Sequence, residues 1–480
     1  MTAPLVIRGA VVLQEARAPF RDAAMDILVE GGRIVSIAPT GAEHPHGVQI
    51  VDGTGRLATA GLVNAHTHSQ SAAMAGFADA VSHPAFMWLT QAHTAGRPAE
   101  EIRVATLLTA LHMIRSGSTA AIDHFPGQRF TADDIDAVAG AWAESGLRVV
   151  LGLRFFDGAF SDIMPSGAAI PASLRAAVEG NTLLQPQPLA ELRELIPAAV
   201  DKWDGRADRI RIFPAPSNPM RCSDEAILFC TELAESRDLG IHTHLLETAK
   251  QASGAQAQYG CSMVSHLDRL GVLSDRWSCA HTIWVDEADI AVLAARGAIV
   301  VHNPESNSRL GAGVAPIPDL LKAGVTVALG TDGAGANDNM DMHLAMRAAA
   351  VLHRPQIPSP ADWITAADAM AMATTGGAAA IRRPGLGRLQ PGADADIVLY
   401  RLDAPWWAQI NDPVAQLAFA ETGGSVDTVV VGGEVVMEAG RVLVFDEASV
   451  LAEARAMAKR LRSRNADLFR VAELIATGVN

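Results

Sequence analysis

The chain has 480 residues, of which 49% are hydrophobic and 19% are charged. This balance excludes a wholly disordered chain or a collagen-like repeat and indicates a soluble globular protein. The formal net charge of −15 argues against nonspecific electrostatic binding to nucleic acid or to an anionic membrane. We therefore expect a small molecule as the partner, with no nucleic acid and no membrane involved.

The sequence shows neither a membrane span nor a secretion signal. No apolar run approaches the ~20 residues of a membrane-spanning helix, and the first residues lack the order of a signal peptide. This predicts a cytoplasmic protein. Reduced thiols are expected, because no CxxC pair occurs among Cys222, Cys230, Cys261 and Cys279.

Short β-rich runs separated by turn residues occupy both ends of the chain. One of them passes through Gly432-Gly433, a pair typical of a hairpin turn. We predict that residues 1–58 and 386–480 together build a small β-sandwich module. The second segment ends in a helix over 447–468, which packs on the protein or contacts another subunit. The β-rich runs cover residues 5–9, 26–37, 48–53, 395–400 and 429–436.

Between these ends, apolar strand-like runs alternate with longer helical patterns, which predicts βα units and a parallel sheet. Eight such runs favour closure into a distorted (β/α)8 TIM-type barrel of the α/β class over residues 59–385. The runs cover residues 61–66, 120–124, 149–154, 210–214, 241–244, 278–281, 298–302 and 326–332.

Seven of these eight runs end in a polar side chain. A single histidine in such a position usually packs in the core. Seven polar ends together indicate a functional site, because the carboxyl ends of barrel strands converge on one rim. The residues are His66, His124, Arg154, His244, His281, His302 and Asp332.

Two His-x-His pairs and one aspartate indicate a metal site at this rim. In His66-Thr67-His68 both imidazoles point the same way on an extended strand and can share one ion. His242-Thr243-His244 repeats the pattern, with Glu247 three residues later as a candidate acid/base. Asp332 is either a turn residue or a ligand. It completes a set suited to zinc, iron or manganese, namely His66, His68, His244 and Asp332.

The ordered series of motifs resembles the amidohydrolase superfamily. It is most similar to the branch that holds S-adenosylhomocysteine and methylthioadenosine deaminases and triazine hydrolases. The resemblance covers about residues 5–450, including the divided β module. It is carried by AHTH (65–68), HTHLLET (242–248), CAH (279–281), VHNPESN (301–307), LGTDG (329–333) and the glycine-containing segment 384–398.

The resemblance implies one divalent metal ion, held by His66, His68, His244 and Asp332, with His242 in a structural role. Zinc is the expected ion, and iron or manganese are the alternatives. Binuclear branches of the superfamily use a carboxylated lysine at a strand end. A mononuclear site is expected, because no predicted barrel strand ends in a lysine; the lysines are Lys202, Lys250, Lys322 and Lys459.

The resemblance also assigns Glu247, His281 and Asp332 to catalysis. A bound cation lowers the pKa of its water toward ~7. Asp332 can then take a proton from that water, His281 can orient the hydroxide, and Glu247 can protonate a ring nitrogen. This predicts an aminohydrolase that deaminates a purine or nucleoside derivative, a pyrimidine, a pterin or a triazine. The first alternative is hydrolysis of an amide, urea or carbon–halogen bond. A non-catalytic scaffold is a more remote alternative, because all the expected site residues are retained.

Substrate contacts are expected from Trp88, Arg154, Glu247 and Asn307. Trp88 matches an aromatic-leucine element of the family and can stack on a flat heterocycle or pack in the core. Arg154 can bind a carboxylate or hydroxyl of the substrate, or form a structural ion pair. Asn307 can hydrogen-bond the substrate or hold its loop. The family also implies a homodimer or a homotetramer.

Overall fold

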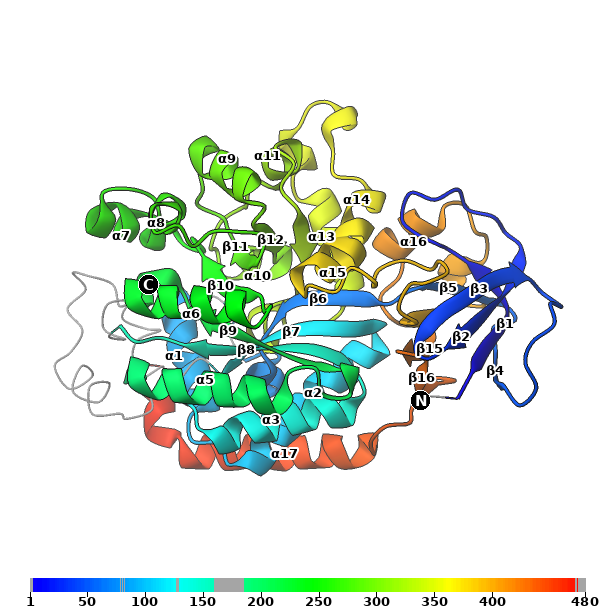
Figure 1. Cartoon of the computed structure of the whole chain (residues 1–480), viewed down its shortest axis with the longest axis horizontal. Coiled ribbons are helices and arrows are strands. Elements are labelled where there is room, and N and C mark those ends of the chain that lie inside the picture. Colours follow the sequence, from blue (N-terminus) through cyan, green and yellow to red (C-terminus); the bar gives the residue numbers. More distant parts are fainter. Residues whose placement is uncertain are drawn as a thin grey trace.

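The protein, described here from a computed structural model, consists of a barrel of alternating strands and helices with a β module beside it (Figure 1). The structure describes residues 3–77, 79, 81, 83–126, 129–158, 185–470 and 473, without the side chains of residues 84 and 88. Both chain ends lie outside the barrel strands, and the chain enters the barrel from the β module and returns to it.

Strands from both ends of the chain join one nine-stranded sheet. The N-terminal strands are β1 (Leu5–Val12), β2 (Ala24–Glu30), β3 (Arg33–Pro39), β4 (Gln49–Asp52) and β5 (Arg56–Ala60), and the C-terminal strands are β14 (Ile397–Arg401), β15 (Val426–Val431), β16 (Glu434–Glu438) and β17 (Arg441–Val442). β5 pairs with β14 and runs through the predicted boundary at residue 58. The predicted hairpin is present, with Gly432 and Gly433 both at positive φ, where glycine is favoured.

All eight predicted barrel strands are present, in two parallel four-stranded halves. They are β6 (Leu62–Thr67), β7 (Ser118–Pro126), β8 (Arg148–Phe155) and β9 (Ile210–Pro216), followed by β10 (Ile241–Leu245), β11 (Trp277–His281), β12 (Ile299–His302) and β13 (Val327–Leu329). Backbone hydrogen bonds cross the two seams between the halves, from His244 N to Ser217 O (3.3 Å) and from Asp332 N to His66 O (2.9 Å). The predicted distorted barrel is therefore confirmed, and three predicted metal ligands lie at its seams.

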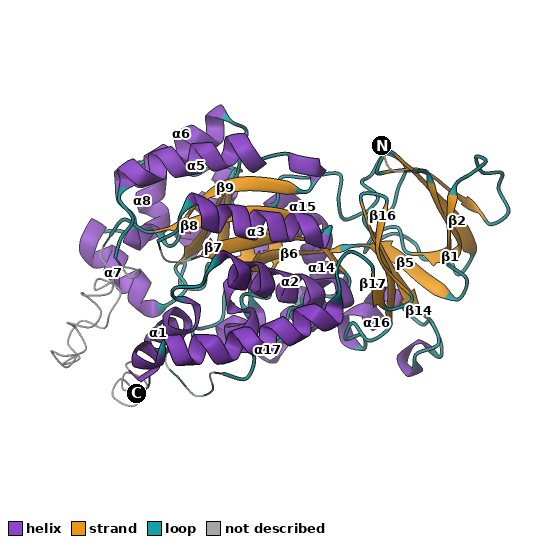
Figure 2. Ribbon diagram, turned by 90° about the horizontal axis from the view of Figure 1, so that it is seen from below, coloured by secondary structure: helices purple, strands orange, loops and turns teal. Residues whose placement is uncertain are grey.

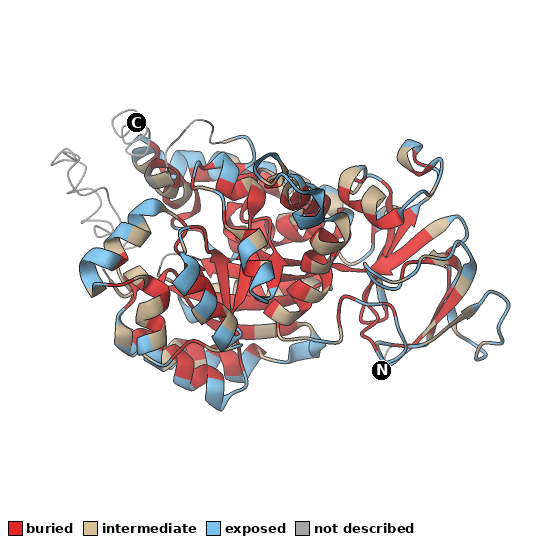
Figure 3. Ribbon diagram, turned by 90° about the horizontal axis from the view of Figure 1, so that it is seen from above, coloured by how far each residue is buried: buried red, intermediate tan, exposed pale blue. Residues whose placement is uncertain are grey.

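Helices wrap the outside of the barrel (Figure 2). The strands beneath them are buried (Figure 3), which explains why they read as continuous apolar runs rather than alternating ones. The larger helices are α1 (His83–Thr94), α2 (Ala99–Arg115), α3 (Ala132–Ser145), α5 (Leu189–Trp203), α6 (Asp224–Ser236), α7 (Ala249–Tyr259), α9 (Glu287–Arg296) and α13 (Met342–Val351). The shorter ones are α8 (Met263–Arg269), α10 (Pro304–Arg309), α11 (Ile317–Lys322), α12 (Ala334–Asn337), α14 (Ala366–Ala371), α15 (Gly377–Ala380) and α16 (Pro413–Phe419).

The predicted C-terminal helix is present as α17 (Glu447–Arg464), drawn in red in Figure 1, and it packs against α2. Its buried face contributes Met457 and Leu461 to a shared apolar cluster. Arg460 Nε donates a hydrogen bond to Glu101 Oε1 at 2.9 Å. Of the two interpretations of this helix, the structure therefore shows packing within the chain.

Two further features concern the cysteines and the character of the helices. The four cysteines are all free and buried. Within the described ranges, none of the helices combines the length and the apolar character that crossing a bilayer requires.

Candidate active site

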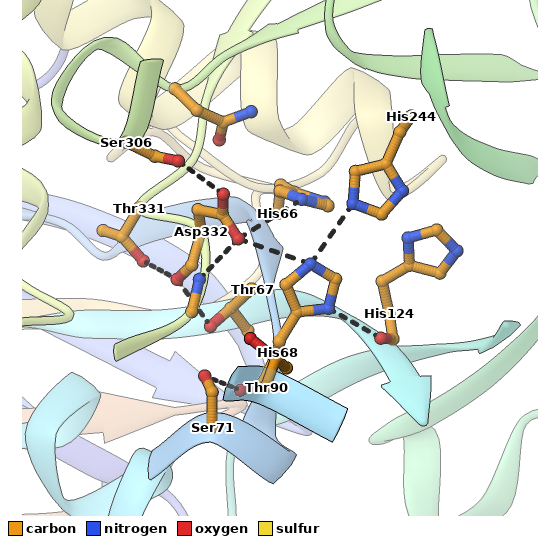
Figure 4. Close-up of polar contacts among 12 residues, drawn as sticks. His66, Thr67, His68, Ser71, Thr90, His124, His244, Ser306, Thr331 and Asp332 are labelled. Carbon is orange, nitrogen blue, oxygen red and sulfur yellow. Dashed lines mark hydrogen bonds and ion pairs between the residues drawn. The ribbon is translucent and has the colours of Figure 1, made fainter. Parts of the chain in front are cut away.

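The four side chains predicted as metal ligands converge at the carboxyl ends of the barrel strands (Figure 4). His66 Nε2 lies 3.8 Å and His68 Nε2 3.3 Å from Asp332 Oδ1. His244 Nε2 lies 3.3 Å from His68 Nε2. Ligand atoms of His66, His68 and Asp332 all lie within 4.8 Å of one another. The structure thus brings together four side chains that come from three distant segments of the sequence.

Backbone carbonyls orient two of the imidazoles toward the centre of this cluster. His68 Nδ1 donates to the carbonyl oxygen of His124 at 2.8 Å. His244 Nδ1 donates to the carbonyl oxygen of Ser217 at 2.6 Å. Since each ring has its Nδ1 proton committed to a carbonyl, each Nε2 keeps a lone pair that faces the centre.

His242 positions the third imidazole, in keeping with its expected structural role. His66 Nδ1 and His242 Nε2 are 2.8 Å apart, and His242 Nδ1 lies 2.8 Å from Ser278 Oγ. Ser278 Oγ in turn donates to the carbonyl oxygen of Ile241 at 3.2 Å. This chain of contacts assigns a proton to Nδ1 of both histidines, which leaves His66 Nε2 as a lone-pair donor.

The cluster has the chemistry of a site for one divalent cation. Burial lowers the pKa of His68 to about 4 and holds the pKa values of His66 and His244 well below their usual range, so the rings are neutral and can bind a metal ion. His66 Nε2 is buried without a hydrogen-bond partner among the described residues. Three imidazoles and one carboxylate fit zinc, iron or manganese.

Asp332 follows β13 by three residues and is held on both carboxylate oxygens. Gly333 N donates to Oδ1 and Ser306 Oγ donates to Oδ2, each at 2.6 Å. The φ of Asp332 is +61° and that of His281 is +71°. Non-glycine residues rarely adopt such angles, and the residues that do are concentrated at functional sites.

Glu247 and His281, the predicted catalytic pair, face the same cluster. His281 Nε2 lies 3.8 Å from Glu247 Oε1 and 4.0 Å from Asp332 Oδ2. His83 Nε2, from α1, lies 3.1 Å from Glu247 Oε1. Burial favours the neutral acid, but His281, His83 and Arg154 outweigh it and hold the pKa of Glu247 well below its usual range. Glu247 is therefore a carboxylate in the free protein.

These groups open into a cavity of about 1000 Å³, which is lined in part by His68, Arg154, His244, Glu247 and Asp332. Arg154 is the penultimate residue of β8, is 6% exposed, and donates from Nε to Ser217 Oγ at 3.0 Å. Burial lowers its pKa to about 10, against the pull of Asp332 and Glu247, so the guanidinium is charged at neutral pH. Its role in binding the substrate stays a prediction.

The other two predicted substrate contacts differ in position. Asn307 Oδ1 accepts a hydrogen bond from His281 Nδ1 at 2.7 Å and lies behind His281 rather than in the cavity wall. Its direct contact with substrate stays a prediction. The side chain of Trp88 lies outside the described residues.

The structure adds residues that sequence reasoning did not place in the site. His83 reaches Glu247 from α1, and no motif in the sequence marks it. Ser306 directly precedes Asn307 in the VHNPESN element. This position beside an expected site residue is the only feature of the sequence that points to Ser306. The sequence marks His124 only as the end of a predicted strand, yet its ring lies within the cluster in Figure 4.

A comparison with protein families gives the class of protein. The amidohydrolase family matches residues 57–436. The chain belongs to this family, as the motif series had indicated.

Individual relatives are similar over nearly the whole chain. The 5-methylthioadenosine/S-adenosylhomocysteine deaminase of Pelotomaculum thermopropionicum is 35% identical over 472 residues, which cover 96% of this chain and all of that protein. An adenosine deaminase from Xanthomonas campestris with bound zinc has a similar structure, with a TM-score of 0.83, 28% identity and coverage of 96% and 99%. The zinc complex of atrazine chlorohydrolase from Arthrobacter aurescens TC1 has a TM-score of 0.85, 27% identity and coverage of 95% and 100%.

Proposed function

We propose that the chain is a zinc-dependent aminohydrolase that hydrolytically removes the amino group of a heterocycle, with adenosine-type purine nucleosides as the first class to test. The observation that carries this proposal is the convergence of His66, His68, His244 and Asp332 with Glu247 and His281 beside one cavity, whose wall includes His68, His244, Glu247 and Asp332. The activities named for the deaminase relatives support the purine class, and the zinc in the two similar structures supports the ion.

When bound, a divalent ion lowers the pKa of a water molecule from 15.7 to near ~7 and so supplies a nucleophile at neutral pH. Asp332 accepts the proton that this water loses. His281 donates from Nδ1 to Asn307, which leaves Nε2 facing Glu247 and Asp332, where it orients the attacking water. Both roles follow from the placement of these side chains, since His281 Nε2 lies 4.0 Å from Asp332 Oδ2 and a group that moves or orients a proton must lie close to it.

Glu247 carries the proton to the substrate. Because it is a carboxylate in the free protein, it first takes up a proton and then delivers it to the ring nitrogen beside the attacked carbon. Asp332 passes the proton that it took from the water to the amino group, and collapse of the tetrahedral adduct expels this group as ammonia while the new hydroxyl loses its proton. Arg154, charged and buried in the cavity wall, binds a hydroxyl or carboxylate of the substrate.

Hydrolysis of a different leaving group is the second candidate. The structural similarity to atrazine chlorohydrolase favours it, because attack by activated water and protonation of a ring nitrogen serve both reactions. An amide or urea substrate would use the same nucleophile. The products distinguish these reactions, since only deamination releases ammonia from the ring.

The assembly of the protein is inferred from the family. The resemblance to other members supports a homodimer or homotetramer, and the cytoplasmic location follows the interpretation of the sequence. Light scattering on the purified chain tests the subunit number.

Removal of the metal is expected to abolish activity and to lower the thermal stability of the protein. An ion present at about 100 times its Kd stabilises the native state by ~2.7 kcal/mol, and that stabilisation is lost with the ion. Activity and melting temperature are measured after dialysis against a chelator and again after zinc is returned, with protein dialysed without chelator as the control. Full activity in protein shown by mass spectrometry to be metal-free would refute metal dependence.

A further inference from the structure

His124 lies in β7 with its ring inside the ligand cluster. The residue is 0% exposed. Its ring stacks on that of His244, with centroids 4.7 Å apart and an interplanar angle of 26°, and on that of His68, at 5.7 Å and 21°. Figure 4 shows this ring beside those of His68 and His244. Its place in the fold is therefore the same strand-end rim that supplies the expected ligands.

A donor atom of His124 is close enough to share an ion with two of those ligands. Ligand atoms of His66, His124 and His244 all lie within 4.8 Å of one another, as do those of His66, His68 and Asp332. His66 belongs to both sets. The two sets therefore form one continuous cluster of five side chains around His66.

Both ring nitrogens of His124 lack a hydrogen-bond partner in the ranges that the structure describes. Burial of a polar group without a partner is unfavourable, so a partner is expected. The surroundings hold the residue firmly in place. Its backbone carbonyl accepts from His68 Nδ1, and the preceding Asp123 accepts from Ser69 N at 2.9 Å and from Trp142 Nε1 at 2.8 Å. A neutral imidazole held this way is a suitable metal ligand.

We propose that His124 is an additional protein ligand of the metal ion, which gives the centre four imidazoles and one carboxylate. The inference rests on the proposed function only in that it requires the metal site. A fifth protein ligand leaves one position for water in a six-coordinate ion. His124 therefore shifts the preference of the centre from strictly tetrahedral coordination toward ions that accept five or six ligands.

The test uses the full-length protein, stripped of metal and titrated with Co²⁺. Affinity is measured by competition with a chelator, and coordination by the visible absorption spectrum of the bound cobalt. His124→Asn is expected to weaken binding at least tenfold, since removal of even a supporting partner of a ligand costs about 10–100-fold, and to change the spectrum toward a lower coordination number. Wild-type affinity together with a wild-type spectrum in this variant would overturn the proposal.

His302→Asn is the matched control. His302 ends β12, is also 0% exposed, and also has both ring nitrogens without a partner among the described residues, but it belongs to neither donor set. We expect its variant to keep the affinity and spectrum of the wild type. Equal weakening in both variants would assign the effect to lost burial and overturn the proposal.

A measurement on the wild-type protein covers the case in which His124→Asn does not fold. In a crystal structure of the zinc-loaded chain, a His124 nitrogen is expected at the ~2.0–2.1 Å of a zinc–imidazole bond, and a nitrogen beyond bonding distance would overturn the proposal. A wild-type protein that binds no metal would refute the proposed function as well. Metal binding without a bond to His124 would refute this inference alone.

Discussion

The Glu247→Gln variant is expected to keep its metal and to lose 10²- to 10⁴-fold in kcat, the range typical of a positioned acid/base. Glutamine preserves the size and polarity of the side chain but cannot take up a proton and deliver it to a ring nitrogen. Since Glu247 is not among the ligands, and its Oε1 instead faces His281 and His83, the ion should remain. Steady-state kinetics with the metal content of the same sample quantified provide the measurement.

Glu305→Gln is the matched control for this substitution. Glu305 lies on α10, and its pKa is raised to about 7 by burial, but it does not line the cavity. We expect wild-type turnover from it. Wild-type turnover from metal-replete Glu247→Gln would instead show that Glu247 does not transfer the proton.

The second large effect is expected from the ligands themselves. His244→Ala and Asp332→Ala each remove one donor from the cluster, so each should lower metal affinity at least tenfold and lower activity in proportion to the metal lost. Elemental analysis after dialysis at a fixed concentration of free zinc measures this effect.

His281→Asn separates metal binding from catalysis. His281 Nδ1 is committed to Asn307 and Nε2 lies 4.0 Å from Asp332 Oδ2, so the variant should keep its metal while turnover falls. Full metal retention in both His244→Ala and Asp332→Ala would refute the ligand assignment. Loss of metal from His281→Asn would place His281 among the ligands.

The sequence predicted the barrel well because its strands are buried on both faces. Such strands read as short apolar runs, and each of the eight runs corresponds to a strand between β6 and β13. The His-x-His spacing of His66 and His68 likewise survives folding, because side chains two apart on a strand share a face. The divided β module was recognisable from β-rich runs and from the turn pair Gly432-Gly433.

Other parts of the site depend on information that spacing does not carry. His83 reaches Glu247 from α1, which requires the path of the chain after β6. Asn307 accepts a hydrogen bond from His281 and does not line the cavity, which depends on how the segment after β12 packs against the end of β11. His124 could be recognised as a strand end, but its distance from His66 and His244 depends on how the two barrel halves curve toward each other.

The most direct test of the account is ammonia release by the purified, metal-quantified protein. The panel contains amino-purines, their nucleosides, amino-pyrimidines, pterins and triazines, each assayed with the Glu247→Gln variant as the blank. We predict stoichiometric ammonia from one class, with adenosine-type nucleosides the expected one. No ammonia from any member of the panel, with metal at one equivalent per chain, would contradict the deaminase assignment and favour hydrolysis of a different leaving group at the same site.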